Sequence, residues 1–101
     1  MNHRQQTLEE LALHDAVISS IHLSWEADRC DLVVWPVGRG SHVLSFEGFT
    51  NIQLPKREPW GRSASINSAR QAQAGLYEIE LQSGDVLSIE APYWSWREEP
   101  K

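Results

Sequence analysis

Two adjacent residues, His14 and Asp15, are the first place where this sequence could support catalysis. A His-Asp pair is typical of metal-dependent phosphohydrolases, which complete their site with further His and Asp ligands. The other histidines, His3, His22 and His42, lie in the N-terminal tail or in segments that we expect to be strands. Two interpretations therefore stay open: part of an active site, or the exit of a short helix with Asp15 bonded to nearby backbone.

A polar run follows the middle of the chain, where Ser63, Ser65, Asn67 and Ser68 precede Arg70. The simplest interpretation is the solvent-facing side of an edge strand. The alternative is a shallow polar ligand site built from His14, Asp15, Ser65 and Asn67. Because the sequence has no Gly-x-Ser-x-Gly elbow, an enzyme that uses His14, Asp15 or the Ser63–Ser68 cluster is the weaker alternative.

Metal and cofactor chemistry find little support in the spacing of the remaining residues. His22, His42 and Cys30 could meet only across strands, and no Cys-x-x-Cys or His-x-x-x-His spacing is present. Gly38-Arg39-Gly40 lacks the spacing of a phosphate-binding loop. We therefore expect no metal and no cofactor, and Cys30, the single cysteine, is predicted to be a small core residue.

The sequence contains five tryptophans, which is many for its length. Trp25 has the parity of a core residue, whereas Trp35 alternates against Leu32 and Val34. The others could cover the core or form an aromatic patch, because Trp and Arg anchor protein interfaces. The candidates for binding a partner protein are Trp35, Trp60, Trp94, Trp96 and Arg62.

The elements that must position these residues are mostly strands. Thr7-Leu8-Glu9-Glu10 predicts a capping box for a short helix over 7–13. Alternating apolar residues predict strands over 16–25, 30–35, 42–54, 63–68, 77–82 and 86–91, with a bend at Gly48 and a loop over 69–75. Short links favour antiparallel neighbours. The expected fold is mainly β (α+β): a curled antiparallel sheet or small β-sandwich of about six strands with a short N-terminal helix.

Composition favours one domain over residues 1–101, with a polar N-terminal tail and a charged C-terminal tail. The chain has 101 residues, a formal net charge of -5 and a sequence pI of about 5.2. An acidic chain with scattered basic residues is a poor nucleic-acid binder, so we expect no nucleic-acid partner. No signal peptide or membrane span is predicted, and the lone cysteine fits a cytoplasmic location.

Several segments together resemble a known group. They are His14 to Ile21, Leu44 to Phe49, Pro59-Trp60-Gly61, Ser65-Ile66-Asn67 and Tyr77 to Gly84. This layout is similar to a family of small uncharacterised bacterial proteins, which is loosely similar in turn to immunity proteins of polymorphic toxin systems. The resemblance implies a bacterial cytoplasmic protein that binds another protein.

The leading hypothesis from the sequence is therefore a non-enzymatic interaction domain of immunity-like character. The alternatives are a small-ligand-binding domain and a homo-oligomeric scaffold in which unpaired edge strands join two copies.

Overall fold

The computed structural model describes residues 7–55 and 64–99. It contains one 3-10 turn and eight strands, listed in chain order: η1 (Leu8–Leu11), β1 (Val17–Ser24), β2 (Arg29–Trp35), β3 (His42–Glu47), β4 (Asn51–Gln53), β5 (Ala64–Gln73), β6 (Leu76–Leu81), β7 (Val86–Glu90) and β8 (Tyr93–Glu98). The strands form one open antiparallel sheet in the order β4-β7-β6-β5-β1-β2-β3-β8. The mainly β fold that the sequence predicts is confirmed.

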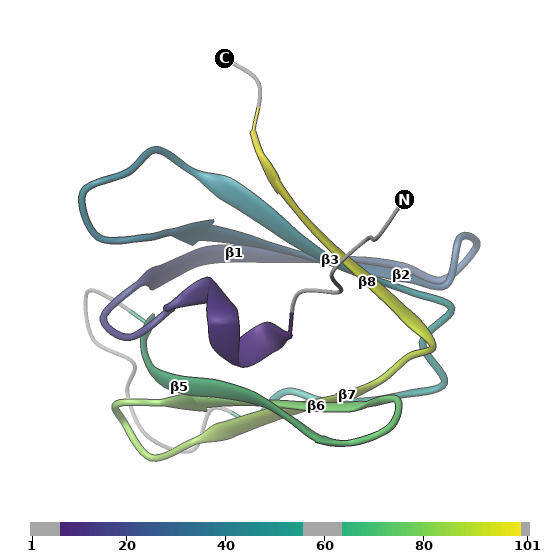
Figure 1. Ribbon diagram of the computed structural model, residues 1–101. Helices are drawn as coiled ribbons and strands as arrows, with labels where there is room; N and C mark the ends of the chain where they lie inside the picture. The colour runs from purple at the N-terminus through teal and green to yellow at the C-terminus, as the bar shows by residue number, and fades with distance from the viewer. Residues whose placement is uncertain (1–6, 56–63, 100–101) are drawn as a thin grey trace, which may run out of the picture.

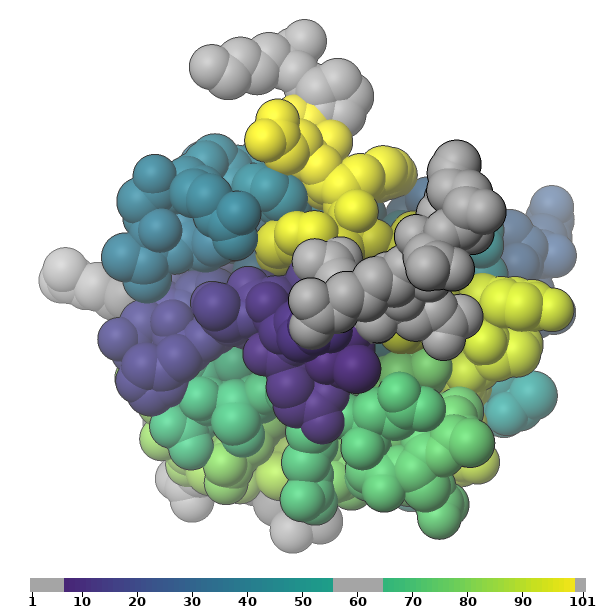
Figure 2. Space-filling model, viewed as in Figure 1, coloured from purple at the N-terminus to yellow at the C-terminus, as the bar shows by residue number. Residues whose placement is uncertain are grey.

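The sheet curls into two layers. In Figure 1, β1, β2, β3 and β8 form the upper layer, β5, β6 and β7 form the lower layer, and η1 lies between them. Figure 2 shows the same arrangement at the surface, where the purple atoms of the N-terminal turn separate the two layers. Leu8, Leu11 and Leu13 are buried, so this segment extends the core at one open side of the sheet.

The strand count is eight rather than six because one expected strand is divided by a bend and a further strand lies beyond the last one expected. Residues 42–54 form β3 and β4, which join different neighbours on either side of Gly48. Gly48 has a φ of +73°, a left-handed value that favours glycine, so the predicted bend at this residue is confirmed. The eighth strand, β8, follows β7 after Ala91 and Pro92 and lies beyond the expected strand 86–91.

The strand β5 is longer than its sequence predicts. The expected loop over 69–75 is wrong, since the strand continues to Gln73 and pairs with β6. Polar and small residues such as Gln71 have low strand propensity, but partner strands regularly override it. Here Ala69 pairs with Ile79, and Arg70 forms an ion pair of 2.6 Å with Glu78.

The N-terminal helix is also shorter than expected, because only the 3-10 turn η1 forms. The carboxylate of Glu10 accepts a hydrogen bond of 2.8 Å from the Thr7 backbone N–H, as the predicted capping box requires. Ala12 then adopts a left-handed conformation with φ +55°, which ends the turn. A turn of four residues depends on the burial of Leu8 and Leu11 rather than on helical propensity.

The core confirms the predicted alternation in three strands. Its inward residues are Cys30, Leu32 and Val34 in β2, Tyr77, Ile79 and Leu81 in β6, and Leu87 and Ile89 in β7. In β1 the pairing with β2 shifts between Ile18 and Ser20, so the bulge at Ser19 reverses the alternation. Ile18 consequently faces the core, whereas strict alternation with Ile21 and Trp25 would place it on the opposite face.

The prediction that Trp25 belongs to the core is wrong, because its side chain is 76% exposed. Beyond the bulge, Ile21 does pack against the core. The strand then runs past the edge of the core, so Leu23 is 44% exposed and Trp25 lies outside β1 altogether.

Candidate functional site

An apolar groove lies between the end of β1 and the edge strand β4. Its volume is about 350 Å³, and its lining residues are Leu23, Trp25, Phe49, Thr50, Asn51, Ile52 and Leu54. We call this hollow the β1–β4 groove. One wall comes from β1 and the residue that follows it, and the other comes from β4 and its flanking residues. Five of the seven residues are apolar, so the groove suits apolar side chains of a ligand.

Trp25 is the most exposed large apolar side chain of the described residues and forms one rim of the groove. Its ring contacts Phe49, with centroids 5.6 Å apart and the planes tilted by 51°. The carbonyl of Asp28 accepts hydrogen bonds from the backbone N–H groups of Gly48 and Phe49, at 2.7 and 3.1 Å. The turn that carries Trp25 is thereby attached to the bend of the other wall, which holds the rim in place.

The opposite wall is an edge of the sheet. In the described part of the chain β4 pairs only with β7, where Asn51, Ile52 and Gln53 lie opposite Glu90, Ile89 and Ser88. Ile52 packs against the core, whereas Asn51 and Gln53 are exposed. An edge strand has backbone groups that a further strand can pair with.

Three carboxylates lie close to groove-lining residues in the chain or by hydrogen bonding. Glu26 and Asp28 follow Trp25 in the β1–β2 turn, and Glu90 accepts a hydrogen bond of 2.9 Å from the Asn51 amide. The whole sequence has fourteen Asp and Glu residues against nine Lys and Arg residues. The described residues include four of the basic ones: Arg29, Arg39, Arg70 and Arg97. Two of the four, Arg29 and Arg70, form ion pairs with Asp31 and Glu78. The carboxylates of Glu26, Asp28 and Glu90 would attract cations to their own part of the surface.

Of the tryptophans predicted to bind a partner, the three that the structure describes do not form one patch. Trp35 is 47% exposed on the outer face of β2, and its indole N–H donates to the Ser19 hydroxyl at 3.2 Å. Trp94 and Trp96 are half-buried on the inner face of β8 against the core. Trp60 and Arg62 lie outside the described residues.

Two larger hollows border these tryptophans but are less apolar. Trp35 lines one of about 810 Å³ together with Arg39, Glu98 and Glu99. Trp94 and Trp96 line another of about 530 Å³, to which Thr7, Gln71 and Ser95 also contribute. Trp96 stacks on the buried ring of His42, with centroids 4.7 Å apart, which indicates a packing role. The β1–β4 groove is therefore the best apolar site among the described residues.

His14 and Asp15 lie near the other residues of the predicted polar site, but the contacts with Ser65 and Asn67 are made by backbone carbonyls, and the Asn67 side chain bonds to Glu80. The ring N–H at Nδ1 of His14 donates to the Asn67 carbonyl at 2.8 Å, and Nε2 lies 3.6 Å from the Asp15 carboxylate. The Gln82 amide donates to Asp15 at 2.5 Å and its backbone N–H donates to the Ser65 carbonyl at 2.8 Å.

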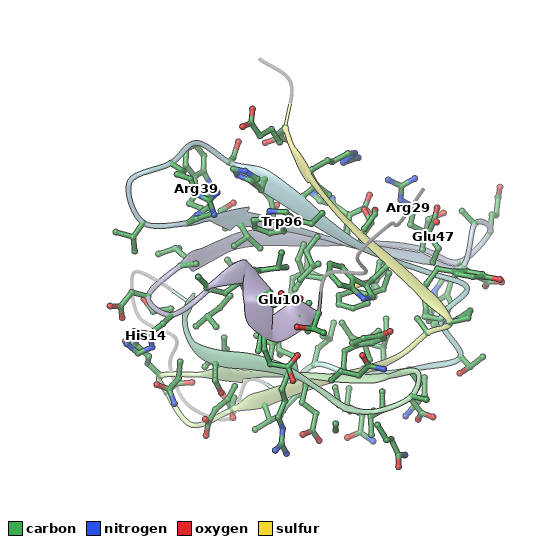
Figure 3. The ribbon with its side chains drawn as sticks, in the orientation of Figure 1. Glu10, His14, Arg29, Arg39, Glu47 and Trp96 are labelled. Atoms are coloured by element: carbon green, nitrogen blue, oxygen red, sulfur yellow. The ribbon has the colours of Figure 1, made fainter. Side chains whose placement is uncertain are left out.

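These contacts connect a turn to neighbouring strands. The side chains of His14 and Asp15 are 66% and 58% exposed, and Figure 3 shows His14 at the periphery. With both carboxylate and imidazole in water, the pair lacks the desolvated environment that activates acid–base groups. The arrangement favours the turn interpretation of this pair over the catalytic one.

The metal candidates from the sequence do not converge. Cys30 faces the core, whereas His22, in the adjacent strand, is exposed. Burial raises the pKa of the Cys30 thiol to about 11, and the Asp31 charge adds to the effect. No three His, Cys, Asp or Glu side chains within residues 7–55 and 64–99 are grouped to hold a metal ion.

A polar network on the outer face of β2 and β3 escaped the sequence analysis. Asp31 accepts hydrogen bonds from Arg29 Nε at 2.8 Å and from the buried Ser45 hydroxyl at 2.6 Å. Burial of Asp31 acts to raise its pKa, but these bonds and the charges of Arg29 and Arg97 outweigh burial and lower the pKa. Arg29 and its neighbour Glu47 project away from the lower layer in Figure 3. The sequence feature that could have predicted this network is the spacing of Arg29 and Asp31, which places both side chains on one face of a strand, opposite Ser45 in the next strand.

Comparisons of the chain with protein-family models, curated proteins and solved structures found no match. Within the described ranges, no helix has the length and apolar character needed to cross a membrane.

Proposed function

We propose that this domain binds another protein through the β1–β4 groove and performs no chemistry of its own. The observation that carries the proposal is the 76% exposure of Trp25 at the rim of an apolar groove. Exposed apolar patches on small proteins commonly mark interaction sites, and tryptophan is enriched among the residues that dominate binding energy.

The resemblance to immunity-like bacterial proteins supports the same proposal. Such proteins act by covering the site of a toxin, which requires a complementary surface rather than a catalytic centre. A single cysteine and an acidic composition are compatible with the bacterial cytoplasm, where we place the domain as part of this proposal.

A second candidate is a homodimer, favoured by the outer edge of β4, with which no strand of the described residues pairs. Two copies could pair their β4 strands about a two-fold axis and bury both Trp25 side chains. Light scattering across a concentration series separates the two candidates. If the homodimer forms, the measured mass of the wild type should rise from that of a monomer to that of a dimer as concentration increases. The mass of Trp25→Ala should stay that of a monomer.

The proposed function is tested by affinity capture from a lysate of the source organism with three immobilised proteins: wild type, Trp25→Ala and Trp35→Ala. Trp35 is the matched control, because it is also exposed but lies on the outer face of β2. We expect a stoichiometric protein that the wild type and Trp35→Ala retain and Trp25→Ala loses. Retention by Trp25→Ala and loss by Trp35→Ala would assign the interface to the Trp35 face instead.

A further inference from the structure

We propose that the occupant of the β1–β4 groove is an extended, basic segment of the partner protein, which adds to β4 as a further strand. This inference rests on the proposed function and specifies its partner and its mode of binding. Strand addition to a sheet edge uses main-chain hydrogen bonds for affinity and alternate side chains for specificity.

The position of β4 supports strand addition. It is the last strand at its end of the sheet, and the described residues place no strand on its outer side. A strand added about 4.8 Å away would extend the sheet across the floor of the groove, toward the β1 wall. Main-chain pairing would then satisfy the free edge of β4 while the partner's side chains enter the groove.

The alternation of β4 specifies which side chains the partner needs. Ile52 faces inward and lines the groove, so residues of the added strand with the same orientation would contact Trp25 and Leu54. Residues with the opposite orientation would lie beside Asn51 and its hydrogen-bonded neighbour Glu90. The partner segment must therefore alternate apolar residues with residues that are favourable near a carboxylate.

Charge complementarity makes these outward residues basic. Glu26 and Asp28 follow Trp25 in the chain, and Glu90 is hydrogen-bonded to Asn51. No basic side chain of residues 7–55 or 64–99 forms an ion pair with any of the three. A second copy of this chain would bring the same carboxylates to the interface, which disfavours self-association. A lysine- or arginine-bearing strand would neutralise them.

The test uses synthetic peptides as probes and the intact 101-residue protein. The first probe is a capped nonapeptide in which lysine alternates with valine and leucine. The second has the same composition with all lysines in one block, which keeps the charge but removes the alternation. The third replaces each lysine of the alternating peptide with glutamate. Binding is measured by fluorescence anisotropy, and amide hydrogen exchange of the ¹⁵N-labelled protein reports on the backbone of β4.

We expect the alternating basic peptide to bind about tenfold or more tightly than the block peptide, and the acidic peptide not to bind. Trp25→Ala should lower the affinity for the alternating peptide about tenfold, while Trp35→Ala should leave that affinity unchanged. Amide exchange of residues 51–53 should slow in the complex, because strand addition protects the edge amides.

The outcomes separate this inference from the proposed function. If Trp25→Ala weakens peptide binding but the amides of residues 51–53 are not protected from exchange, strand addition is overturned and the proposed function stands. Equal affinity for the alternating basic and acidic peptides would overturn the basic partner. If Trp25→Ala loses no captured protein and changes no peptide affinity, the groove is not a site and the proposed function fails. A dimer that Trp25→Ala dissociates would make a second copy the occupant.

Discussion

Asp31 illustrates how single residues hold the outer face of this sheet together. Its carboxylate joins Arg29 and Ser45, and its pKa lies below the usual value because these interactions outweigh burial. A lowered folded-state pKa stabilises the fold at every pH above the unfolded-state value of about 3.9. The stabilisation is lost as pH falls from there through the folded-state pKa.

We therefore expect Asp31→Asn to lower the free energy of unfolding by about 1 kcal/mol at pH 7, since it removes a charged hydrogen-bond acceptor that is partly exposed. The difference from wild type should persist to about pH 5 and shrink below about pH 4. Urea unfolding followed by tryptophan fluorescence at several pH values measures it. Asp28→Asn is the control, because Asp28 forms no ion pair among the described residues. A difference independent of pH would contradict the linkage.

Cys30 provides the second prediction at this scale. Its side chain is fully buried, and burial, followed by the Asp31 charge, raises the thiol pKa to about 11. Because the thiolate is the reactive form, a thiol reagent at pH 8 should label native protein on the order of a hundredfold more slowly than protein in concentrated urea. Mass spectrometry of timed samples measures both rates. Complete labelling of native protein within minutes would show that this part of the core opens readily.

Among the elements, the bend between β3 and β4 determines the position of the groove. Gly48 has φ +73°, and a Cβ at this residue would lie 3.1 Å from Cγ of Pro92. Gly48→Ala should therefore lower the free energy of unfolding by about 1–3 kcal/mol through backbone strain and this contact.

Two other glycines separate these effects in the same urea measurement. Gly38 also has a positive φ, +76°, but open space around it, so Gly38→Ala reports backbone strain alone. Gly40 has neither constraint, and Gly40→Ala should be nearly neutral. Equal losses for Gly48→Ala and Gly38→Ala would show that Pro92 moves aside.

Sequence periodicity predicted most of these elements, and its failures have local physical causes. The β2, β6 and β7 alternation is correct because each strand has one buried face. The bulge at Ser19 leaves no signal in the residue types, so strict alternation assigns Ile18 to the wrong face of the strand. Trp25 has the inward parity, but only the three-dimensional extent of the core shows that the chain has passed beyond it. The groove was missed for the same reason, because its walls are about 25 residues apart in sequence.

For the whole molecule, the formal net charge of -5 affects how a charged partner approaches. The sequence has fourteen Asp and Glu residues against nine Lys and Arg residues, so its excess charge is negative. Such a field acts over about 8–10 Å at physiological salt, so it affects the approach of a charged partner before contact. The apolar groove, by contrast, stabilises the complex only at contact, after water has been excluded from between the two surfaces.

This separation in range predicts different kinetic effects for charge variants and groove variants. With the alternating lysine peptide, Glu26→Gln combined with Asp28→Asn should slow association about two- to tenfold at low salt and leave dissociation nearly unchanged. Trp25→Ala should instead accelerate dissociation about tenfold with little change in association. Stopped-flow fluorescence at low and moderate salt measures both rates. Because screening removes the long-range field, raising the salt should abolish the effect of the charge variant and preserve that of Trp25→Ala. If Trp25→Ala acts mainly on association, tryptophan guides the encounter and the carboxylates lose their assigned role.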